Sequence, residues 1–398
     1  MSDAVEGHRV SPLGWPGDPL AHRPGDEGRP SPLGWPGALP DPPTDDVGGD
    51  APMAVPPQTD SETEDVRMAD AAGAGVTDES HRRIREVLDA ATVSRETAEA
   101  EQDLVSRETE DDLPIAIEAR RAVAVLNPAG QAFPRPPETR IICVANQKGG
   151  VGKTTSTVNL AVALALHGSR VLVIDLDPQG NASTGLGVDH HAGVPSIYDV
   201  LIEGAPVDDV TTEVEGVPGL LCVPATIDLA GAEIELVSVV ARESRLRRAI
   251  DAYPGELDYV LIDCPPSLGL LTVNALVAAR EVLIPIQCEY YALEGLGQLL
   301  RNVELVKAHL NNEVRVSTIL LTMYDGRTKL ADQVAAEVRE HFQDTVLSTV
   351  IPRSVRVSEA PGYGQSVMTY DPGSRGATSY LSAAREIAER GSKEAAEV

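Results

Sequence analysis

A glycine-rich loop holds the residues of this sequence whose chemistry is clearest. It reads NQKGGVGKTT from Asn146, after a short apolar run and before a segment of helix length. Glycines allow backbone N–H groups to surround an anion, and the start of the next helix adds partial positive charge there. The Lys153 ammonium can reach the β- and γ-phosphates of a nucleotide, and the Thr154 hydroxyl can ligate magnesium. Because the loop lies between a strand and a helix, we favour a phosphate-binding loop over a chance turn. The residues that we expect to bind the phosphates are Gly149, Gly150, Val151, Gly152, Lys153, Thr154 and Thr155.

Aspartates follow two further apolar runs. The segment VLVIDLDPQGNAS places Asp175 and Asp177 two residues apart at a strand end, hence on one side of it. The segment YVLIDCPPSLG ends its apolar run at Asp263, which is the Walker B pattern. Such a carboxylate holds Mg²⁺ through water, because this ion keeps part of its hydration shell. We predict that Thr154 and Asp263 share one magnesium ion with the phosphates, so that catalysis rests on positioning and charge neutralisation.

Six short apolar runs must position these loops. They are rich in β-branched and aliphatic residues and read RIICVA, RVLVID, LLCVP, YVLIDC, EVLIPI and VSTILL. Such runs indicate strands buried on both faces, and between them lie helix-length segments at 154–167, 266–279, 291–310 and 328–342. The alternation predicts an α/β fold, a doubly wound, mostly parallel sheet with helices on both faces. Its functional loops should lie at the carboxyl ends of the strands.

The loop departs from the usual phosphate-loop pattern in a way that indicates a family. Gln147 stands where GxxxxGK[ST] requires glycine, and Lys148 follows it. KGGVGKTT resembles the deviant Walker A motif of the ParA/MinD superfamily of P-loop NTPases. The resemblance implies that Lys148 reaches across a dimer to the partner's phosphates, so that ATP forms part of the interface. With Lys153 of its own chain, the partner's lysine would neutralise charge on the transferred phosphoryl group, as an arginine finger does elsewhere.

Two further segments resemble the same family. DLDPQGNAS is similar to the ParA switch I motif DxDPQGNAT, with Ser183 in place of threonine. This similarity implies that Asp177 orients or polarises the attacking water and that Asp175 supports the loop. The Asp-x-Pro-Pro form after Asp263 is also typical of ParA proteins.

The stretch 320–376 resembles chromosomal, Soj-type ParA proteins. The resemblance implies that Arg327, Arg353 and Arg356 line a DNA-backbone groove that is continuous only in the dimer, with Lys329 as a weaker candidate. It also places Pro352 near the adenine. Non-specific DNA binding needs phosphate contacts and weakens steeply with salt. A rival basic patch, or simply a solvated helix face, is formed by Arg242, Arg245, Arg247 and Arg248.

The formal net charge of −28 argues against DNA affinity of the chain as a whole. Any DNA contact must therefore come from a local patch, which dimerisation would double on one face. Residues 1–137 hold 18 of the 30 prolines and a charge of −15. A segment of this composition cannot bury enough apolar surface to offset the chain entropy that is lost on folding. We predict a disordered acidic tail at 1–112, a connecting segment packing at the domain edge at 113–137, an ATPase domain at 138–392 and a flexible C-terminus at 393–398.

Two repeats and a short helical pattern lie in this tail. SPLGWPG occurs at 11–17 and 31–37, either as a docking motif or as a duplication without function. VSRET occurs at 93–97 and 105–109, and residues 81–91 have helical spacing. Codons for VSRET include the palindrome GTTTCACGTGAAAC, which matches the parS consensus bound by ParB. The repeats either record parS sites within the gene or are an ordinary duplication, and the nucleotide sequence distinguishes the two.

The function that the resemblance implies is a Mg²⁺-dependent ATPase of chromosome or plasmid partitioning. Its ATP-bound homodimer would bind double-stranded DNA non-specifically and release it after hydrolysis stimulated by a ParB-type partner. We expect a cytoplasmic protein, because the widely spaced cysteines indicate reduced core thiols and no signal peptide or membrane span is evident. The resemblance implies that it is nucleoid-associated.

Four alternative functions compete with this interpretation. A MinD-like membrane ATPase would need a basic amphipathic C-terminus, whereas GSKEAAEV is acidic. An iron–sulfur reductase would need cysteines at the dimer face, and only Cys264 fits loosely. A ligase of the dethiobiotin-synthetase kind leaves DxDPQGN and EAPGYG unexplained. A ParA-like ATPase that positions another cargo stays open.

Overall fold

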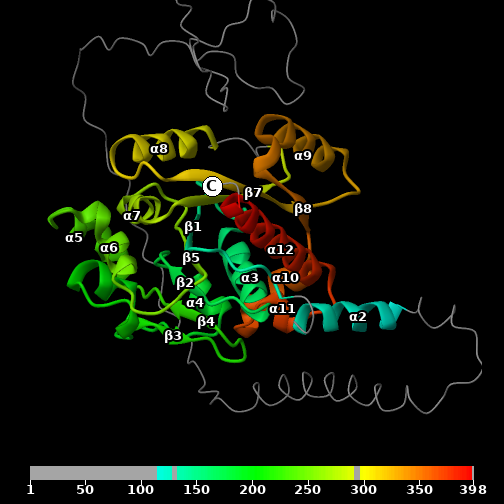
Figure 1. The fold of residues 1–398 in the computed structure, drawn as a ribbon, viewed down its shortest axis with the longest axis horizontal. Helices are drawn as coiled ribbons and strands as arrows, with labels where there is room; N and C mark the ends of the chain where they lie inside the picture. Colours follow the sequence, from blue (N-terminus) through cyan, green and yellow to red (C-terminus); the bar gives the residue numbers. More distant parts are fainter. Residues whose placement is uncertain (1–113, 128–131, 291–295, 397–398) are drawn as a thin grey trace, which may run out of the picture. The chain divides into compact units, whose positions relative to one another are not determined.

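The computed structural model describes residues 114–127, 132–290 and 296–396. The predicted tail at 1–112, the helical pattern at 81–91 and both repeats lie outside these ranges. The described residues form an eight-stranded sheet in the order β3-β4-β2-β5-β1-β6-β7-β8 (Figure 1). All neighbouring strands are parallel except β3 and β4. The strands are β1 (Arg140–Val144), β2 (Val171–Asp175), β3 (Thr212–Glu213), β4 (Leu220–Val223), β5 (Tyr259–Asp263), β6 (Glu281–Gln287), β7 (Arg315–Tyr324) and β8 (Val346–Pro352).

Helices connect the parallel strands. The α-helices are α2 (Pro114–Leu126), α3 (Lys153–Leu166), α4 (Asn181–Gly185), α5 (Leu229–Leu236), α6 (Arg245–Asp251), α7 (Leu270–Ala278), α8 (Leu296–His309), α9 (Lys329–Phe342), α10 (Val355–Glu359), α11 (Val367–Tyr370) and α12 (Arg375–Ala396). Short turns of other helix types are η1 (Asp199–Glu203), η2 (Asp208–Val210), η3 (Arg242–Ser244), η4 (Gln343–Thr345) and η5 (Ala360–Tyr363).

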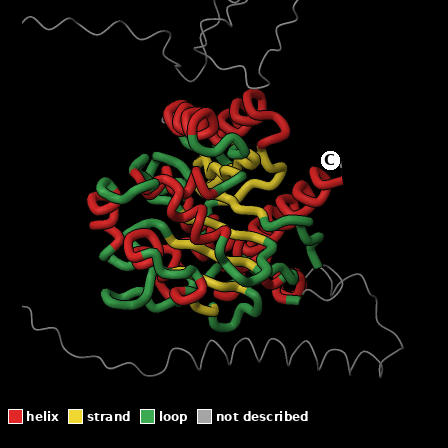
Figure 2. The backbone as a smooth tube through the Cα atoms, turned by 60° about the vertical axis from the view of Figure 1, so that its left-hand side comes forward, coloured by secondary structure: helices red, strands yellow, loops and turns green. Residues whose placement is uncertain are grey.

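The helices cover both faces of the sheet. Helices α3 and α12 pack together on one face, and α7 and α8 contact each other and strands β1 and β7. Figure 2 shows the strands as a central layer with helices on either side. Along β1, Ile142 and Val144 join the core under α3 and α12, whereas Cys143 between them is buried outside that cluster. Both faces of the sheet are therefore apolar, as the continuous hydrophobic runs predict.

The six predicted strands are present as β1, β2, β4, β5, β6 and β7, so the prediction of a doubly wound, mostly parallel sheet is confirmed. Strands β3 and β8 were not predicted. Helix α7 begins at Leu270 rather than at 266, because two prolines and a glycine occupy the turn after β5. Helix α8 is described from Leu296 onward. Helix α12 continues to Ala396 and so includes part of the 393–398 segment for which flexibility was predicted.

Helix α2 lies in the connecting segment 113–137. It buries Ala122 and Val125 and contacts α3, α11 and α12. The Val125 carbonyl oxygen lies 3.3 Å from His167 Nε2, and the His167 ring stacks on Phe133 with the ring centroids 4.5 Å apart. The domain bounds proposed from composition stay a prediction.

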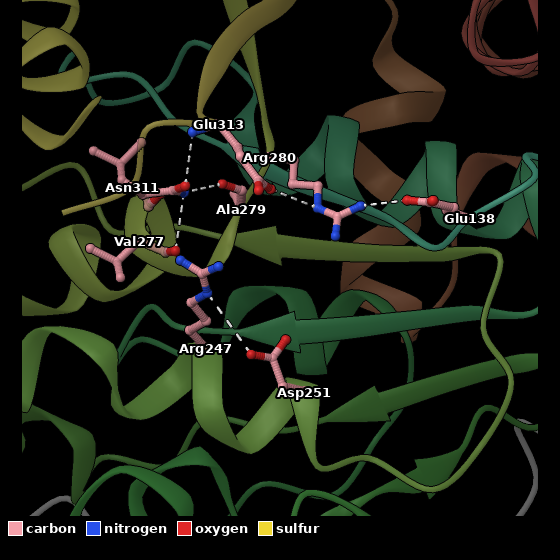
Figure 3. A network of polar contacts seen from close by, with 9 residues as sticks. Glu138, Arg247, Asp251, Val277, Ala279, Arg280, Asn311 and Glu313 are labelled. Atoms are coloured by element: carbon pink, nitrogen blue, oxygen red, sulfur yellow. Dashed lines mark hydrogen bonds and ion pairs between the residues drawn. The ribbon is translucent and has the colours of Figure 1, made fainter. Parts of the chain in front are cut away.

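Polar contacts close the amino-terminal edge of the sheet (Figure 3). Arg280, which precedes β6, donates to Glu138 at 2.8 Å and pairs with Glu313 at 3.1 Å. The buried Asn311 amide donates to the carbonyl oxygens of Val277 and Ala279 and accepts from the Glu313 backbone N–H. The candidate site lies at the opposite edge of the sheet, at the carboxyl ends of the strands.

Candidate nucleotide-binding site

The phosphate loop joins β1 to α3 at the carboxyl edge of the sheet. Gly150 and Gly152 have φ values of 72° and 90°, a left-handed conformation that suits glycine and allows the loop to curl over the start of α3. Lys153, the first residue of α3, is only 7% exposed. The helix therefore directs its amino end and one buried ammonium group at the space enclosed by the loop.

Neighbouring strands hold this loop in place. The Asn146 side-chain amide donates to the Pro285 carbonyl oxygen of β6 at 2.8 Å, and its oxygen accepts from the Lys148 backbone N–H at 3.0 Å. The Thr322 hydroxyl of β7 donates to the Val151 carbonyl oxygen at 2.8 Å. The sequence analysis missed Asn146 and Thr322, since β1, β6 and β7 become neighbours only in the folded sheet.

Asp263, the last residue of β5, faces two hydroxyl groups of α3. The Thr154 hydroxyl donates to Asp263 Oδ2 at 2.7 Å, and the Thr157 hydroxyl donates to Oδ1 at 3.0 Å. Thr154 and Asp263 are thus adjacent, as a shared magnesium ion requires, and hydroxyl and carboxylate oxygens are the ligands this ion prefers. Thr157 was missed, although its position three residues after Thr154 places it on the same helix face.

The carboxyl end of β2 supplies the second pair of aspartates. Asp175 is fully buried and accepts from the Ser183 N–H and hydroxyl at 2.8 and 2.7 Å, and from the Asp177 N–H at 3.2 Å. Asp177 is 9% exposed and accepts from the Gln179 N–H at 3.0 Å. Asp175 therefore fixes the loop that carries Asp177, and Ser183 makes the contact at the position where the family motif has threonine.

Burial shifts the acid–base properties of this centre. Desolvation, and then repulsion by Asp175, raises the pKa of Asp263. Desolvation also raises the pKa of Asp175. Desolvation lowers the pKa of Lys153, against the opposing attraction of Asp263 and Asp177. The carboxyl groups of Asp175, Asp177 and Asp263 thus lie near a single buried lysine, and such a set of oxygen ligands suits a divalent cation.

The two lysines of the loop lie in different environments. Lys153 is buried beside Asp263, whereas Lys148 is half-buried on the exposed first half of the loop. Among the residues that the structure describes, the Lys148 ammonium makes no hydrogen bond or ion pair. Contacts within the described part of the chain therefore do not explain its function.

Two of the candidate DNA-binding arginines come from adjacent strand ends. Tyr324 of β7 pairs with Pro352 of β8, the residue proposed near the adenine, and the Arg353 N–H donates to the Tyr324 carbonyl oxygen at 3.0 Å. Arg353 forms an ion pair with Glu289 at 2.7 Å. Arg327, whose side chain is 88% exposed, donates twice to Asp325, at 2.8 and 2.7 Å.

Arg356 follows on α10 and is also paired. It lies 3.1 Å from Glu359 and 3.2 Å from Asp371. An acidic residue therefore accompanies each candidate arginine, which sequence reading did not anticipate. The second basic patch, at α6 and the turn before it, contacts its own surroundings. Arg245 donates to the Ile202 carbonyl oxygen. Arg242, Arg247 and Arg248 contact residues close to them in sequence.

The described residues also bear on the iron–sulfur alternative. Cys264 is buried with its sulfur 3.2 Å from that of Cys143, and all four cysteines are buried free thiols, so Cys264 does not present a ligand at a surface. In the described part of the chain, no helix is both long enough and apolar enough to cross a membrane.

Comparisons with known proteins give close relatives. A family model described as an AAA domain matches residues 139–316. Sporulation initiation inhibitor protein Soj of Bacillus subtilis (strain 168) is 55% identical over 252 residues, which are 63% of this chain and 99% of Soj. Chromosome partitioning protein ParA of Caulobacter vibrioides (strain NA1000 / CB15N) is 53% identical over 253 residues, which are 63% of this chain and 94% of that protein.

Solved structures share the fold. Cobyrinic acid a,c-diamide synthase of Mycobacterium smegmatis, with a bound ATP analogue and magnesium, is 41% identical with a TM-score of 0.52, over 57% of this chain and 91% of that one. The septum site-determining protein MinD of Pyrococcus horikoshii OT3, complexed with Mg-ADP, is 28% identical with a TM-score of 0.51, over 65% of this chain and 97% of that one.

Proposed function

Because this chain belongs to the ParA/Soj family of chromosome-partitioning ATPases, we propose that it is a Mg²⁺-dependent ATPase that closes into a DNA-binding homodimer when ATP is bound. Gly149 to Thr155 would hold the phosphates, with Pro352 near the adenine and Thr154 and Asp263 at the magnesium ion. The ion would offset phosphate charge, and Asp177 would orient the attacking water. Hydrolysis would open the dimer and release the DNA.

One observation carries this proposal. The phosphate loop holds one lysine buried beside the carboxylate centre and leaves a second without a partner among the described residues. Lys153 suffices for the phosphates of its own site, whereas Lys148 is free to reach those of a second subunit. Dimerisation would then depend on the γ-phosphate.

The DNA contact would be formed by Arg327, Arg353 and Arg356 from both subunits. Three arginines beside acidic partners make a weak site, and a dimer doubles their number on one face. The partners we propose are non-specific duplex DNA and a ParB-type activator. The protein would act in the cytoplasm on the nucleoid, without a membrane.

The test is co-sedimentation of the purified full chain with arbitrary duplex DNA, with ATP, ADP or no nucleotide, over a range of salt. We expect retention that requires ATP and falls steeply with salt. Anionic vesicles serve as the parallel arm. Retention on vesicles but not on DNA would support a MinD-like function instead, and equal behaviour with every nucleotide would refute the proposal.

Substitution of the two lysines separates their proposed contributions. Lys148→Ala should leave ATP binding within about twofold of wild type but abolish the ATP-dependent dimer, because only the partner's phosphates lose a contact. Lys153→Ala should weaken ATP binding itself by about 1.5–3 kcal/mol, or roughly 10- to 150-fold, because a charged contact to the phosphates is lost. Isothermal titration calorimetry and light scattering measure the two effects. An unchanged dimer in Lys148→Ala would contradict the shared site.

A further inference from the structure

Two glycines that are distant in sequence touch through their backbones. Gly187 follows α4, and Gly364 follows η5. A Cβ atom at Gly187 would lie 2.9 Å from the Gly364 carbonyl oxygen, and one at Gly364 would lie 3.3 Å from the Gly187 Cα. Both residues also have left-handed backbones, with φ values of 68° and 65°. Both positions therefore favour glycine for its conformation, and at Gly187 an added Cβ would also be too close to the Gly364 backbone.

On one side of this contact lies the nucleotide site. Helix α4 begins directly after the loop of Asp177, and Ser183 within it donates to Asp175 through both its N–H and its hydroxyl. The Gly187 N–H donates to the Thr184 carbonyl oxygen at 3.0 Å. The position of Gly187 is thus set by the carboxyl end of β2 through a short, hydrogen-bonded helix.

On the other side lies an arginine of the candidate DNA groove. Helix α10 carries Arg356 and ends at Glu359, which pairs with it, and η5 continues directly from Ala360. The Tyr363 ring of η5 stacks on that of Tyr370 with the ring centroids 5.0 Å apart. Helix α10, η5 and α11 contact one another. Arg356 is thus held on a small packed unit whose one edge is Gly364.

We propose that the contact between Gly187 and Gly364 couples the nucleotide site to the DNA groove within each subunit. A shift of α4 when Asp177 engages the γ-phosphate and its water would move η5 directly, because no side chain separates the two backbones. Arg356 would then change its position relative to the DNA backbone. The two glycines are positioning residues, and the inference rests on the proposed function.

Coupling of this kind is reciprocal and therefore measurable in two directions. If ATP increases the affinity for duplex by some factor, duplex must increase the affinity for ATP by the same factor. A residue needed only for folding would lower both affinities without changing that factor. A coupling residue changes the factor itself.

The experiment compares Gly364→Ala and Gly187→Ala with Gly216→Ala in the full chain. Gly216 has a similar φ of 76° and nothing within 4 Å of an added Cβ, so it reproduces the backbone strain without the contact. For each variant we would measure duplex affinity with the non-hydrolysed analogue AMPPNP and without nucleotide, and AMPPNP affinity with and without duplex, so that both measurements belong to one thermodynamic cycle. Light scattering would monitor the AMPPNP-dependent dimer.

We expect the coupling factor of Gly364→Ala and Gly187→Ala to fall about fivefold or more, equally in both directions. Their AMPPNP affinity without DNA and their dimerisation should match Gly216→Ala. Should strain unfold the alanine variants, Gly364→Asn serves in their place, because asparagine tolerates the left-handed conformation yet still adds the Cβ. A coupling factor equal to that of Gly216→Ala would overturn the inference. Absence of nucleotide-dependent DNA binding in the wild type would instead overturn the proposed function.

Discussion

Asp263 is the buried carboxylate that we propose as a ligand of magnesium. It lies at the end of β5, accepts hydroxyl hydrogen bonds from Thr154 and Thr157, and is fully buried. A carboxylate in this environment is costly unless a cation is near. The same burial that raises its pKa would make Asp263 an effective ligand for a divalent ion, because water cannot screen the attraction.

The affinity for Mg-ATP should therefore depend on pH. Burial and the charge of Asp175 raise the pKa of Asp263 to about 8. With this raised pKa, the carboxyl would hold a proton at pH 7 in the metal-free protein, and magnesium would have to displace it. Affinity should thus rise as the pH increases towards about 8 and level off above it, by up to about tenfold per pH unit. Calorimetry at pH 7 in buffers of different ionisation enthalpy measures the released proton.

Asp263→Asn is the control for this measurement. Its amide has no proton to release, so the observed heat should no longer depend on the buffer. A wild-type heat that is independent of buffer would show that Asp263 is already ionised in the empty site.

The acidic partners of the arginines give a second prediction for single residues. Glu289 is bound to Arg353 at 2.7 Å and would compete for it with DNA in the proposed groove. Glu289→Gln should raise duplex affinity up to about fivefold, since exposed ion pairs contribute roughly 0–1 kcal/mol. Glu313→Gln is a matched control, with the same charge change at the amino end of β7, next to Arg280. Equal effects of the two variants in a binding titration would mean that total charge, not Arg353, is responsible.

At the scale of elements, a buried ion pair joins two strands to the last helix. Arg140 of β1 donates to both oxygens of Glu281 of β6 at 2.7 Å, and also to the Ile387 carbonyl oxygen of α12 at 2.7 Å. Burial alone would raise the pKa of Glu281, but its hydrogen bonds to Arg140 lower it overall. The pair therefore anchors α12 against the strands that carry the phosphate loop.

Glu281→Ala should destabilise the fold by about 3–5 kcal/mol, because it leaves the buried Arg140 charge without its carboxylate. Urea unfolding measures this free energy, provided that the slope of the transition is unchanged. Glu138→Ala removes an exposed partner of Arg280 and should cost about 0–1 kcal/mol. If the two variants differ by less than about 1 kcal/mol, the buried pair does not anchor the helix.

At the scale of the whole molecule, negative charge opposes the proposed DNA contact. Residues 1–112 contain 26 acidic and 9 basic side chains, so they carry much of the net charge of −28. Repulsion between this segment and DNA acts over about a Debye length, which is roughly 10 Å at 0.1 M salt.

Deletion of residues 1–112 should therefore strengthen ATP-dependent duplex binding at low salt and change it little at high salt. ATP affinity should stay constant, since the phosphate loop and its anchors are retained. Fluorescence anisotropy with labelled duplex over a salt series measures the effect. Equal affinities of the two proteins at every salt concentration would show that the segment does not influence DNA binding.

The local sequence determined the chemistry of this protein and the class of its fold. The phosphate loop, Asp175, Asp177 and Asp263 each follow an apolar run directly, and parallel strands bring their carboxyl ends to one edge. Six strands were recognisable because burial on both faces requires continuous apolar runs. Strand β3, with only two residues, and β8, with a partly exposed pattern, lack that signal.

Only the tertiary structure decided which distant residues support the site. Asn146 and Thr322 hold the phosphate loop through β6 and β7, and an acidic residue lies beside each candidate arginine. The contact between Gly187 and Gly364 joins segments that no local pattern relates. The reason is physical: propensity and periodicity act over a few residues, whereas these neighbours are set by which strands pair in the sheet and by how the other segments pack on it.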